Sequence, residues 1–282
     1  MIEARNLSKS YGKHCVLKDF NIDIGPGQIV ALLGLNGAGK TSFIQSLLGL
    51  TDYQGSLEVC GLNPRKKRCA LMQKMCFIAD VAILPRWLKV KNALDFVEGV
   101  HPKFDREKAE RLIKRTNILM NQRVQELSKG MVVQLHLALV MAIDVDILVL
   151  DEPTLGLDML YRKRFYRYLL EDYYTQERSI IVATHQVEEI ESIVTHLVML
   201  RQGEKVLDCS MADFSERFKS VTVNQDQVEA IESLNPLSSQ KRLGKTTFVL
   251  DVSDIQAHPL LADAQPASIS EVFVAKMEGV EV

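Results

Sequence analysis

Short, almost entirely apolar segments alternate along the chain with longer segments of helical spacing. The apolar segments lie at residues 29–33, 147–150 and 179–183. Their length and continuous apolarity are typical of strands that are buried on both faces of a parallel sheet. Apolar residues recur at helical spacing over residues 41–50, 88–118, 131–143 and 162–174. Strands separated by helices of this length predict an α/β fold with a mostly parallel sheet.

The pattern changes after about residue 215. Residues 246–252 have the composition of a strand, and residues 269–277, which follow Pro266, have that of a short helix. We therefore expect residues 1–215 to form the main domain and residues 216–282 to form a small α+β extension. The sequence leaves three roles open for the extension, which are to cover the main domain, to dimerise or to bind a regulator.

The composition is that of an ordinary globular chain without a strong attraction to nucleic acid or anionic membranes. There are 34 Lys and Arg residues against 36 Asp and Glu residues, a formal net charge of −2, and 47% of the residues are hydrophobic. This hydrophobic content excludes a chain that is disordered throughout. No segment reaches the roughly 20 apolar residues of a membrane span, because the best candidate, residues 138–150, contains Asp144 and Asp146. The 5 cysteines are scattered without metal-site spacing, which favours a reducing cytosol.

Residues 34–41 combine three features that bind phosphate groups. They read Gly-Leu-Asn-Gly-Ala-Gly-Lys-Thr, match the pattern G-x-x-x-x-G-K-[ST], and lie between a predicted strand and a predicted helix. Glycines let backbone N–H groups point at the phosphates, and the N-terminus of the helix favours an anion. Lys40 adds a positive charge at the β- and γ-phosphates, and the Thr41 hydroxyl is a ligand for Mg²⁺. We expect the nucleotide to contact Asn36, Gly37, Ala38, Gly39, Lys40, Thr41 and Ser42.

Two acidic residues follow the second apolar segment. Asp151 and Glu152 come directly after residues 147–150. The carboxyl end of a strand in the same parallel sheet lies at the same edge as the phosphate-binding loop. Asp151 is then placed to hold Mg²⁺ through water, and Glu152 to orient or deprotonate a water that attacks the γ-phosphate.

These motifs occur in the order in which they occur in the ATP-binding subunits of ABC transporters, which the sequence resembles. The resemblance covers residues 1 to about 212. It implies that Tyr11 stacks on the adenine ring of ATP. It also implies that Glu152 is the catalytic carboxylate and that His185 is the switch histidine, which contacts the γ-phosphate. The matching motifs are Walker A at residues 34–41, Walker B at residues 147–151 and the D-loop at residues 156–158.

Two positions depart from the pattern of this family. Residues 127–131 read Leu-Ser-Lys-Gly-Met, where the ABC signature is usually Leu-Ser-Gly-Gly-Gln. Ser128 and Gly130 remain, and the resemblance implies that they close over the γ-phosphate of ATP on a second cassette; the lysine between them adds positive charge. Asp80 stands where the family has the Q-loop glutamine, which makes it a third candidate ligand of Mg²⁺. Whether this aspartate replaces the glutamine in function stays open.

The resemblance also implies an architecture and a set of partners. The expected fold is that of a P-loop NTPase, with a RecA-like mixed or parallel sheet core, an N-terminal antiparallel β-subdomain and an inserted helical subdomain at about residues 86–145. Two cassettes face each other head to tail, as a homodimer or a heterodimer, with two molecules of ATP and Mg²⁺ between them. An integral membrane permease is the other partner, so the chain is expected at the cytoplasmic face of the inner membrane.

The expected direction of transport depends on similarities that are less specific than these motifs. Residues 101–105 and 266–277 resemble a bacterial exporter-type subgroup, whose members pair with separately encoded ABC-2-like permeases. Export of a drug, a peptide or a similar compound is therefore expected, and a nutrient importer is the alternative. Soluble ABC ATPases that act on nucleic acid or ribosomes are a third class. They carry two cassettes or a long coiled coil, and neither is present here, so no nucleic-acid partner is expected.

Two surface features complete the prediction. Residues 161–168 are rich in basic and aromatic side chains, and this pattern favours a helix with an aromatic core-facing side and a solvated cationic side. Trp87 and Leu88 follow the Q-loop region, where the family docks its permease. An interface and a place in the core are both open for these two residues.

Overall fold

The computed structural model describes residues 1–79, 84–242, 244–253, 255 and 258–278. Asp80, the candidate metal ligand at the Q-loop position, lies outside these residues. Within the part of the chain that is described, no helix is both long enough and apolar enough to cross a membrane.

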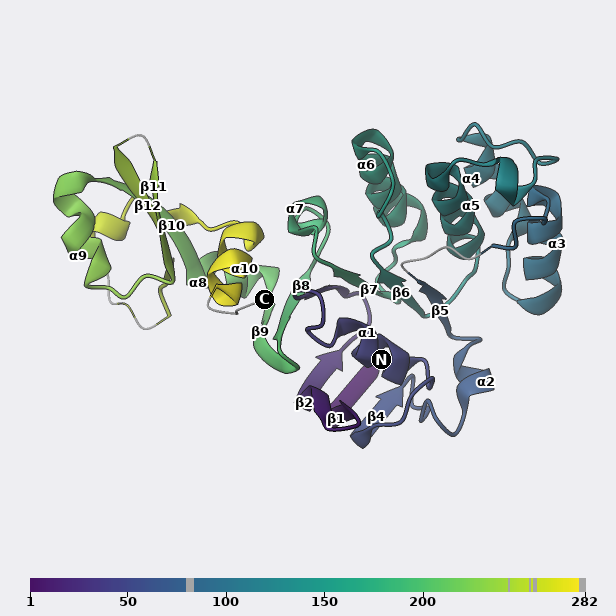
Figure 1. The fold of residues 1–282 in the computed structure, drawn as a ribbon, viewed down its shortest axis with the longest axis horizontal. Coiled ribbons are helices and arrows are strands. Elements are labelled where there is room, and N and C mark those ends of the chain that lie inside the picture. Colours follow the sequence, from purple (N-terminus) through teal and green to yellow (C-terminus); the bar gives the residue numbers. More distant parts are fainter. Residues whose placement is uncertain (80–83, 243, 254, 256–257, 279–282) are drawn as a thin grey trace.

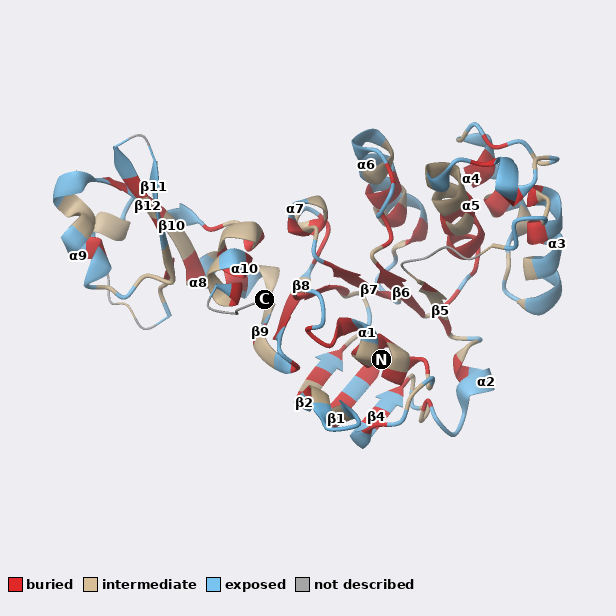
Figure 2. Ribbon diagram, in the orientation of Figure 1, coloured by how far each residue is buried: buried red, intermediate tan, exposed pale blue. Residues whose placement is uncertain are grey.

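A six-stranded sheet forms the centre of the molecule (Figure 1). Its strands are, in spatial order, β5 (Met75–Ile78), β6 (Ile147–Asp151), β7 (Ser179–Thr184), β3 (Ile29–Leu33), β8 (His196–Arg201) and β9 (Glu204–Ser210). The first five are parallel and β9 is antiparallel. Every residue of β3, β6 and β7 is buried (Figure 2), because both faces of the sheet are covered. The predicted α/β core is therefore confirmed.

A smaller antiparallel sheet is formed by β1 (Ile2–Tyr11), β2 (His14–Ile24) and β4 (Gln54–Val59), in the order β2-β1-β4. Helix α1 (Lys40–Leu47) packs between this sheet and the central one. Phe43 meets Phe20 of β2 edge to face, with ring centroids 4.9 Å apart, and belongs to the same buried cluster as Val30 and Leu32 of β3. The N-terminal β-subdomain that the resemblance implied is confirmed, and it holds one side of α1 in place.

The remaining helices of the main body cover the sheet or extend beyond it. Short helix α2 spans Arg68–Leu71, and α3 (Val90–Val100), α4 (Arg106–Lys114) and α5 (Lys129–Met141) lie together as the predicted helical region (Figure 1). A 3₁₀ turn at Val124–Glu126 precedes α5. Helix α6 (Met159–Tyr168) continues as a π-helical turn over Leu169–Tyr173, and α7 spans Val187–Ile190.

Residues beyond β9 form a four-stranded antiparallel sheet with short helices. The order is β11 (Ser238–Arg242), β12 (Lys245–Asp251), β10 (Phe218–Asn224) and β13 (Gln265–Pro266). Helices α8 (Met211–Arg217), α9 (Val228–Glu232) and α10 (Ile269–Met277) accompany it, with 3₁₀ turns at Gln225–Gln227 and Pro259–Leu261. The α+β character of this region is confirmed. Helix α10 packs on α7, where the Ile269 N–H donates to the Glu191 carboxylate over 2.8 Å.

Helix α10 has the predicted bounds, and the N-termini of α5 and α6 differ from the predicted ones for a local reason. Helix α5 begins at Lys129 because the Ser128 side chain accepts a hydrogen bond from the Met131 N–H. Helix α6 begins at Met159 because Asp158 accepts one from the Tyr161 N–H. These side chains cap the free N–H groups of the first turn, so both helices begin before the first apolar position of the predicted ranges. Over residues 161–168 the predicted division holds, with Phe165 and Tyr166 buried and Lys163, Arg164 and Arg167 exposed.

Candidate active site

The loop between β3 and α1 accepts only glycine at two of its positions. Gly39 has a φ of +108°, and a Cβ built there would lie 2.5 Å from the Val16 carbonyl oxygen. A Cβ on Gly34 would lie 2.7 Å from the Leu200 carbonyl oxygen. Both distances are too short for any side chain, so close packing of the loop against neighbouring strands requires these glycines. The backbone then turns directly into the N-terminus of α1, whose free N–H groups favour an anion.

Replacing Gly39 with alanine is therefore expected to weaken both folding and nucleotide binding. The left-handed backbone alone costs about 1–3 kcal/mol for a residue with a Cβ, and the contact with the Val16 carbonyl adds to this. Gly99→Ala is the matched control, because Gly99 lies within α3 and a Cβ added there would meet no side chain or other segment within 4 Å. Alanine should therefore stabilise that helix by roughly 0.5–1 kcal/mol. Urea unfolding of both variants, with and without ATP, measures the difference; equal stabilities would contradict this reading of the loop.

The Lys40 side chain is buried and hydrogen-bonded to the backbone of the phosphate-binding loop. Its side chain is 7% exposed, and its Nζ donates hydrogen bonds to the carbonyl oxygens of Gly34, over 2.7 Å, and Leu35, over 3.3 Å. Burial lowers the pKa of Lys40 from its ordinary value, while the negative charges of Glu152 and Asp151 act in the opposite direction. The ammonium group is thus held at the centre of the loop, where it can contact a phosphate bound by the surrounding N–H groups.

Thr41 and Asp151 offer the ligands that Mg²⁺ prefers. The Thr41 hydroxyl, in the first turn of α1, donates to Asp151 Oδ2 at the end of β6 over 3.4 Å. The described residues contain no group of three or more His, Cys, Asp or Glu side chains that could hold a metal by themselves. Mg²⁺ is usually bound by one or two carboxylates together with substrate phosphates and waters. A hydroxyl and a carboxylate beside a phosphate-binding loop fit that mode of binding.

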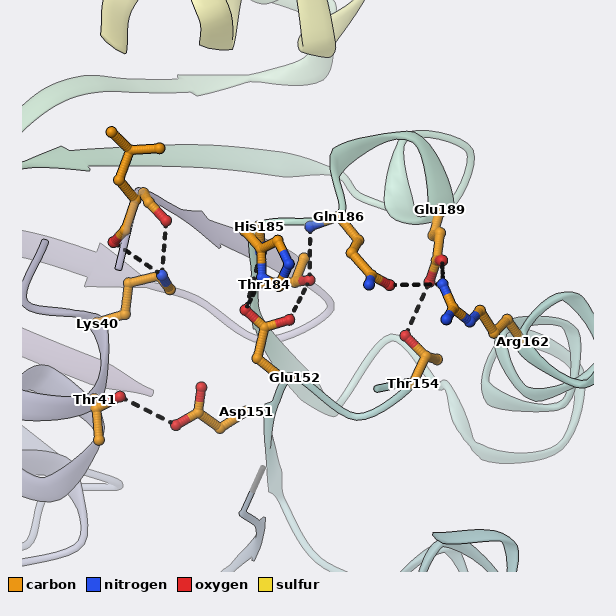
Figure 3. A network of polar contacts seen from close by, with 12 residues as sticks. Lys40, Thr41, Asp151, Glu152, Thr154, Arg162, Thr184, His185, Gln186 and Glu189 are labelled. Atoms are coloured by element: carbon orange, nitrogen blue, oxygen red, sulfur yellow. Dashed lines mark hydrogen bonds and ion pairs between the residues drawn. The ribbon is translucent and has the colours of Figure 1, made fainter. Parts of the chain in front are cut away.

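Glu152 is oriented by the last residue of β7 and by the residue that follows it (Figure 3). Its Oε2 accepts a hydrogen bond from the Thr184 hydroxyl over 2.8 Å, and its Oε1 accepts one from the His185 backbone N–H over 3.0 Å. His185 Nδ1 lies 2.7 Å from the same Oε1. The backbone of Glu152 has a φ of +47°, a conformation that costs about 1–3 kcal/mol outside glycine. It is held there partly by the Glu152 N–H, which donates to the Ala183 carbonyl over 2.8 Å.

A cavity of about 490 Å³ joins these groups, a size typical of small-molecule sites. Its lining includes these predicted site residues: Asn36, Gly37, Ala38, Gly39, Lys40, Thr41, Ser42, Asp151 and Glu152. It also includes residues that the sequence analysis did not single out: Val16, Ile44, Gln45, Leu48, Leu50, Phe77 and Ala79. Gln45 follows Thr41 by one helical turn, and this spacing could have identified it. Val16 and Phe77 come from strands distant in sequence and carry no such signal.

The other predicted site residues that the structure describes lie outside the lining of this cavity. His185 contacts it through Glu152. Tyr11 is 49% exposed, and its hydroxyl donates to Gln45 Oε1 over 3.1 Å, which places the ring beside the cavity. Ser128 and Gly130 begin α5 and are not among the lining residues in the described part of the chain. Within one chain, the phosphate-binding loop, both acids and the histidine lie together. The signature segment at residues 127–131 does not line their cavity.

Comparisons with known proteins identify the family of the chain. A family profile described as "ABC transporter" matches residues 17–155. The chain is 28% identical to Nod factor export ATP-binding protein I of Cupriavidus metallidurans, over 100% of this chain and 98% of that protein. It is 30% identical to the protein of the same name from Burkholderia lata, over 73% of this chain and 70% of the relative.

The fold is also found among solved structures. An ATP-binding cassette in a dimeric post-hydrolysis state, bound to ADP and phosphate, aligns with a TM-score of 0.65 over 75% of this chain and 99% of the other, at 19% identity. The chain belongs to the ABC transporter family, as an ATP-binding subunit that hydrolyses ATP.

Proposed function

We propose that this chain hydrolyses ATP at Glu152, in a site completed by a second cassette, and that hydrolysis powers export through a separately encoded membrane permease. One observation carries the first part of the proposal. Lys40, Thr41, Asp151 and Glu152, from two distant parts of the sequence, line one cavity, and Glu152 is oriented beside His185.

The chemistry assigns a separate task to each group. The N–H groups of the loop and Lys40 bind the β- and γ-phosphates. Mg²⁺ held by Thr41 and Asp151 would supply positive charge to the phosphate oxygens. Glu152 accepts a proton from water as the water oxygen forms a bond to the γ-phosphorus. The bond from that phosphorus to the oxygen shared with the β-phosphate breaks, and ADP and inorganic phosphate leave.

The second cassette would supply Ser128 and Gly130. Since these residues do not line the cavity of their own chain, they are available to a cavity on a partner. Exposed apolar side chains beside the start of α6 support an interface there, with Leu155 42%, Met159 74% and Leu160 61% exposed. The similar cassette structure is itself dimeric. A second copy of this chain is the simplest partner, and a related cassette would also fit.

The permease would dock on the helical region. Trp87 is 70% exposed and Leu119 is 66% exposed. Their segments lie side by side, because the Gln125 N–H donates to the Arg86 carbonyl and the Val90 N–H to the Gln122 carbonyl. Phe96 and Val100 on α3 are also exposed. Apolar side chains gathered on one subdomain favour a protein partner, and the permease would hold the chain at the cytoplasmic face of the inner membrane.

Replacing Trp87 with serine is expected to reduce binding of the permease while leaving ATP hydrolysis by the isolated chain unchanged. A central aromatic residue of an interface typically contributes about 2 kcal/mol or more to binding, so the amount of co-purified permease should fall at least about tenfold. Val274→Ser is the control, because Val274 is exposed on α10 in a different region. Equal recovery of the permease with both variants would remove Trp87 from the interface.

Export is the direction that the relatives favour, since two of them are named Nod factor export proteins. The cargo class is a drug, a peptide or a similar compound selected by the permease. A purified complex of chain and permease is expected to hydrolyse ATP without an external substrate-binding protein. Strict dependence on such a protein would instead indicate a nutrient importer.

A further inference from the structure

Arg162 does not line the candidate active site but contacts residues connected to it, and its side chain joins three segments (Figure 3). Its Nε donates a hydrogen bond to the Leu157 carbonyl oxygen over 2.7 Å, in the loop between β6 and α6. Its Nη1 donates to Gln186 Oε1 over 2.9 Å and forms an ion pair with the Glu189 carboxylate. One guanidinium group therefore connects α6 to the loop before it and to the start of α7.

The contact with Gln186 leads directly to the catalytic groups. The Gln186 backbone N–H donates to the Thr184 hydroxyl over 3.0 Å, and that hydroxyl donates to Glu152 Oε2 over 2.8 Å. His185 is the residue between these two. A shift of Gln186 would thus displace both the histidine and the hydroxyl that orients the Glu152 carboxylate.

A second connection reaches Glu152 from the other side. The Thr154 hydroxyl, 1% exposed, donates to Glu189 Oε2 over 2.9 Å. The Leu157 N–H donates to the Thr154 carbonyl over 3.0 Å. Residues 152–157 are therefore fixed at Thr154 through Glu189 and at Leu157 through Arg162, and Glu152 begins this short loop.

The geometry requires arginine and not only a positive charge. The Arg162 and Glu189 side chains are 26% and 20% exposed, so their partners are largely protein atoms. Arginine presents donors in a rigid planar fork and can serve several acceptors at once. Lysine keeps the charge, but its single ammonium group on a flexible stem cannot hold the Leu157 carbonyl, the Gln186 amide and the Glu189 carboxylate in one plane.

We propose that Arg162 is a positioning residue for ATP hydrolysis. It fixes the position of Glu152 relative to His185 by joining the loop at residues 152–157 to Gln186. The inference rests on the catalytic roles proposed for Glu152 and His185. The same loop leads into the exposed apolar residues at the start of α6. Contact with a second cassette at that surface would therefore act on the catalytic pair through Arg162.

The test is Arg162→Lys, measured by single-turnover hydrolysis and by equilibrium ATP binding. Because small misplacements of catalytic groups are costly, the rate is expected to fall about 10- to 100-fold, while ATP affinity and the thermal midpoint stay unchanged. Gln186→Met, which removes only the amide, should slow hydrolysis in the same way. The double variant should be no slower than Arg162→Lys alone, because the two residues act through one connection. Arg167→Lys on the exposed side of α6 is the matched control.

Three results would overturn the proposal. The first is a wild-type rate in Arg162→Lys, and the second is a loss of ATP affinity or stability that parallels the loss of rate, which would mark a purely structural ion pair. The third is a wild-type rate in Gln186→Met. Rapid turnover by Glu152→Gln is a different outcome, because it would remove the proposed role of Glu152 itself.

Discussion

Replacing Glu152 with glutamine is expected to stop turnover while ATP stays bound. The amide oxygen can still accept the hydrogen bond of the His185 N–H, which lies 3.0 Å from Oε1, and the amide NH2 can donate to the Thr184 hydroxyl, which lies 2.8 Å from Oε2. The amide cannot accept a proton from the attacking water. Loss of a general base lowers the rate by about 10²- to 10⁴-fold. Single-turnover hydrolysis measures this loss, and light scattering with ATP should show a stable dimer, because the bound nucleotide is no longer consumed.

Glu188→Gln is the matched control for this variant. Glu188 is exposed on α7, three residues beyond His185, so the same change of charge occurs close to the site without touching the attacking water. It should retain the wild-type rate and a dimer that forms only transiently. Rapid hydrolysis by Glu152→Gln would exclude Glu152 as the base.

Replacing Lys40 with alanine is expected to weaken ATP binding and to abolish nucleotide-dependent dimerisation. The substitution deletes the buried positive charge of the loop and leaves the Gly34 and Leu35 carbonyls without the Nζ donor. A hydrogen bond to a charged group contributes about 1.5–3 kcal/mol, so ATP affinity should fall by at least about tenfold. Titration calorimetry with ATP and Mg²⁺ measures the affinity, and sedimentation measures the dimer.

Lys66→Ala controls for the loss of a lysine, since Lys66 is exposed and distant from the loop in sequence. It should bind ATP as the wild type does. Undiminished dimerisation of Lys40→Ala with ATP would show that Lys40 does not bind the phosphates.

The phosphate-binding loop could be predicted because its parts are consecutive in the sequence. The buried strand, the glycines, Lys40 and the helix N-terminus all lie within residues 29–47, and each leaves a local pattern. Asp151 and Glu152 could be assigned because they end a second strand with the same apolar signature. The parallel sheet then brings the two segments to one edge, so a general rule of topology was sufficient.

Other parts of the site depend on contacts that have no local pattern. Val16 and Phe77 line the cavity as single apolar residues from separate strands. Arg162 stands in a basic and aromatic segment, which predicts only an amphipathic helix. Its actual partners, the Leu157 carbonyl, Gln186 and Glu189, come from the neighbouring loop and from α7.

The extension at residues 216–282 likewise contains one strand that the sequence predicts and one that it does not. Strand β12 could be predicted because Phe248, Val249 and Leu250 are buried together. Its neighbour β11 reads Ser-Ser-Gln-Lys-Arg and is largely exposed at the edge of the sheet. Polar residues at both faces give no alternation, so the hydrogen bonds to β12, not the side chains, make this segment a strand.

The central claim is that ATP hydrolysis by this chain drives a membrane permease, and one purification tests it. The tagged Glu152→Gln variant is isolated from native membranes with ATP, which should hold the assembled complex, and the proteins that co-purify are identified. The account predicts a polytopic membrane protein in stoichiometric amount, whose recovery falls when Trp87→Ser is added. Recovery of soluble partners or ribosomes alone would leave the ATPase chemistry intact and contradict the role in transport.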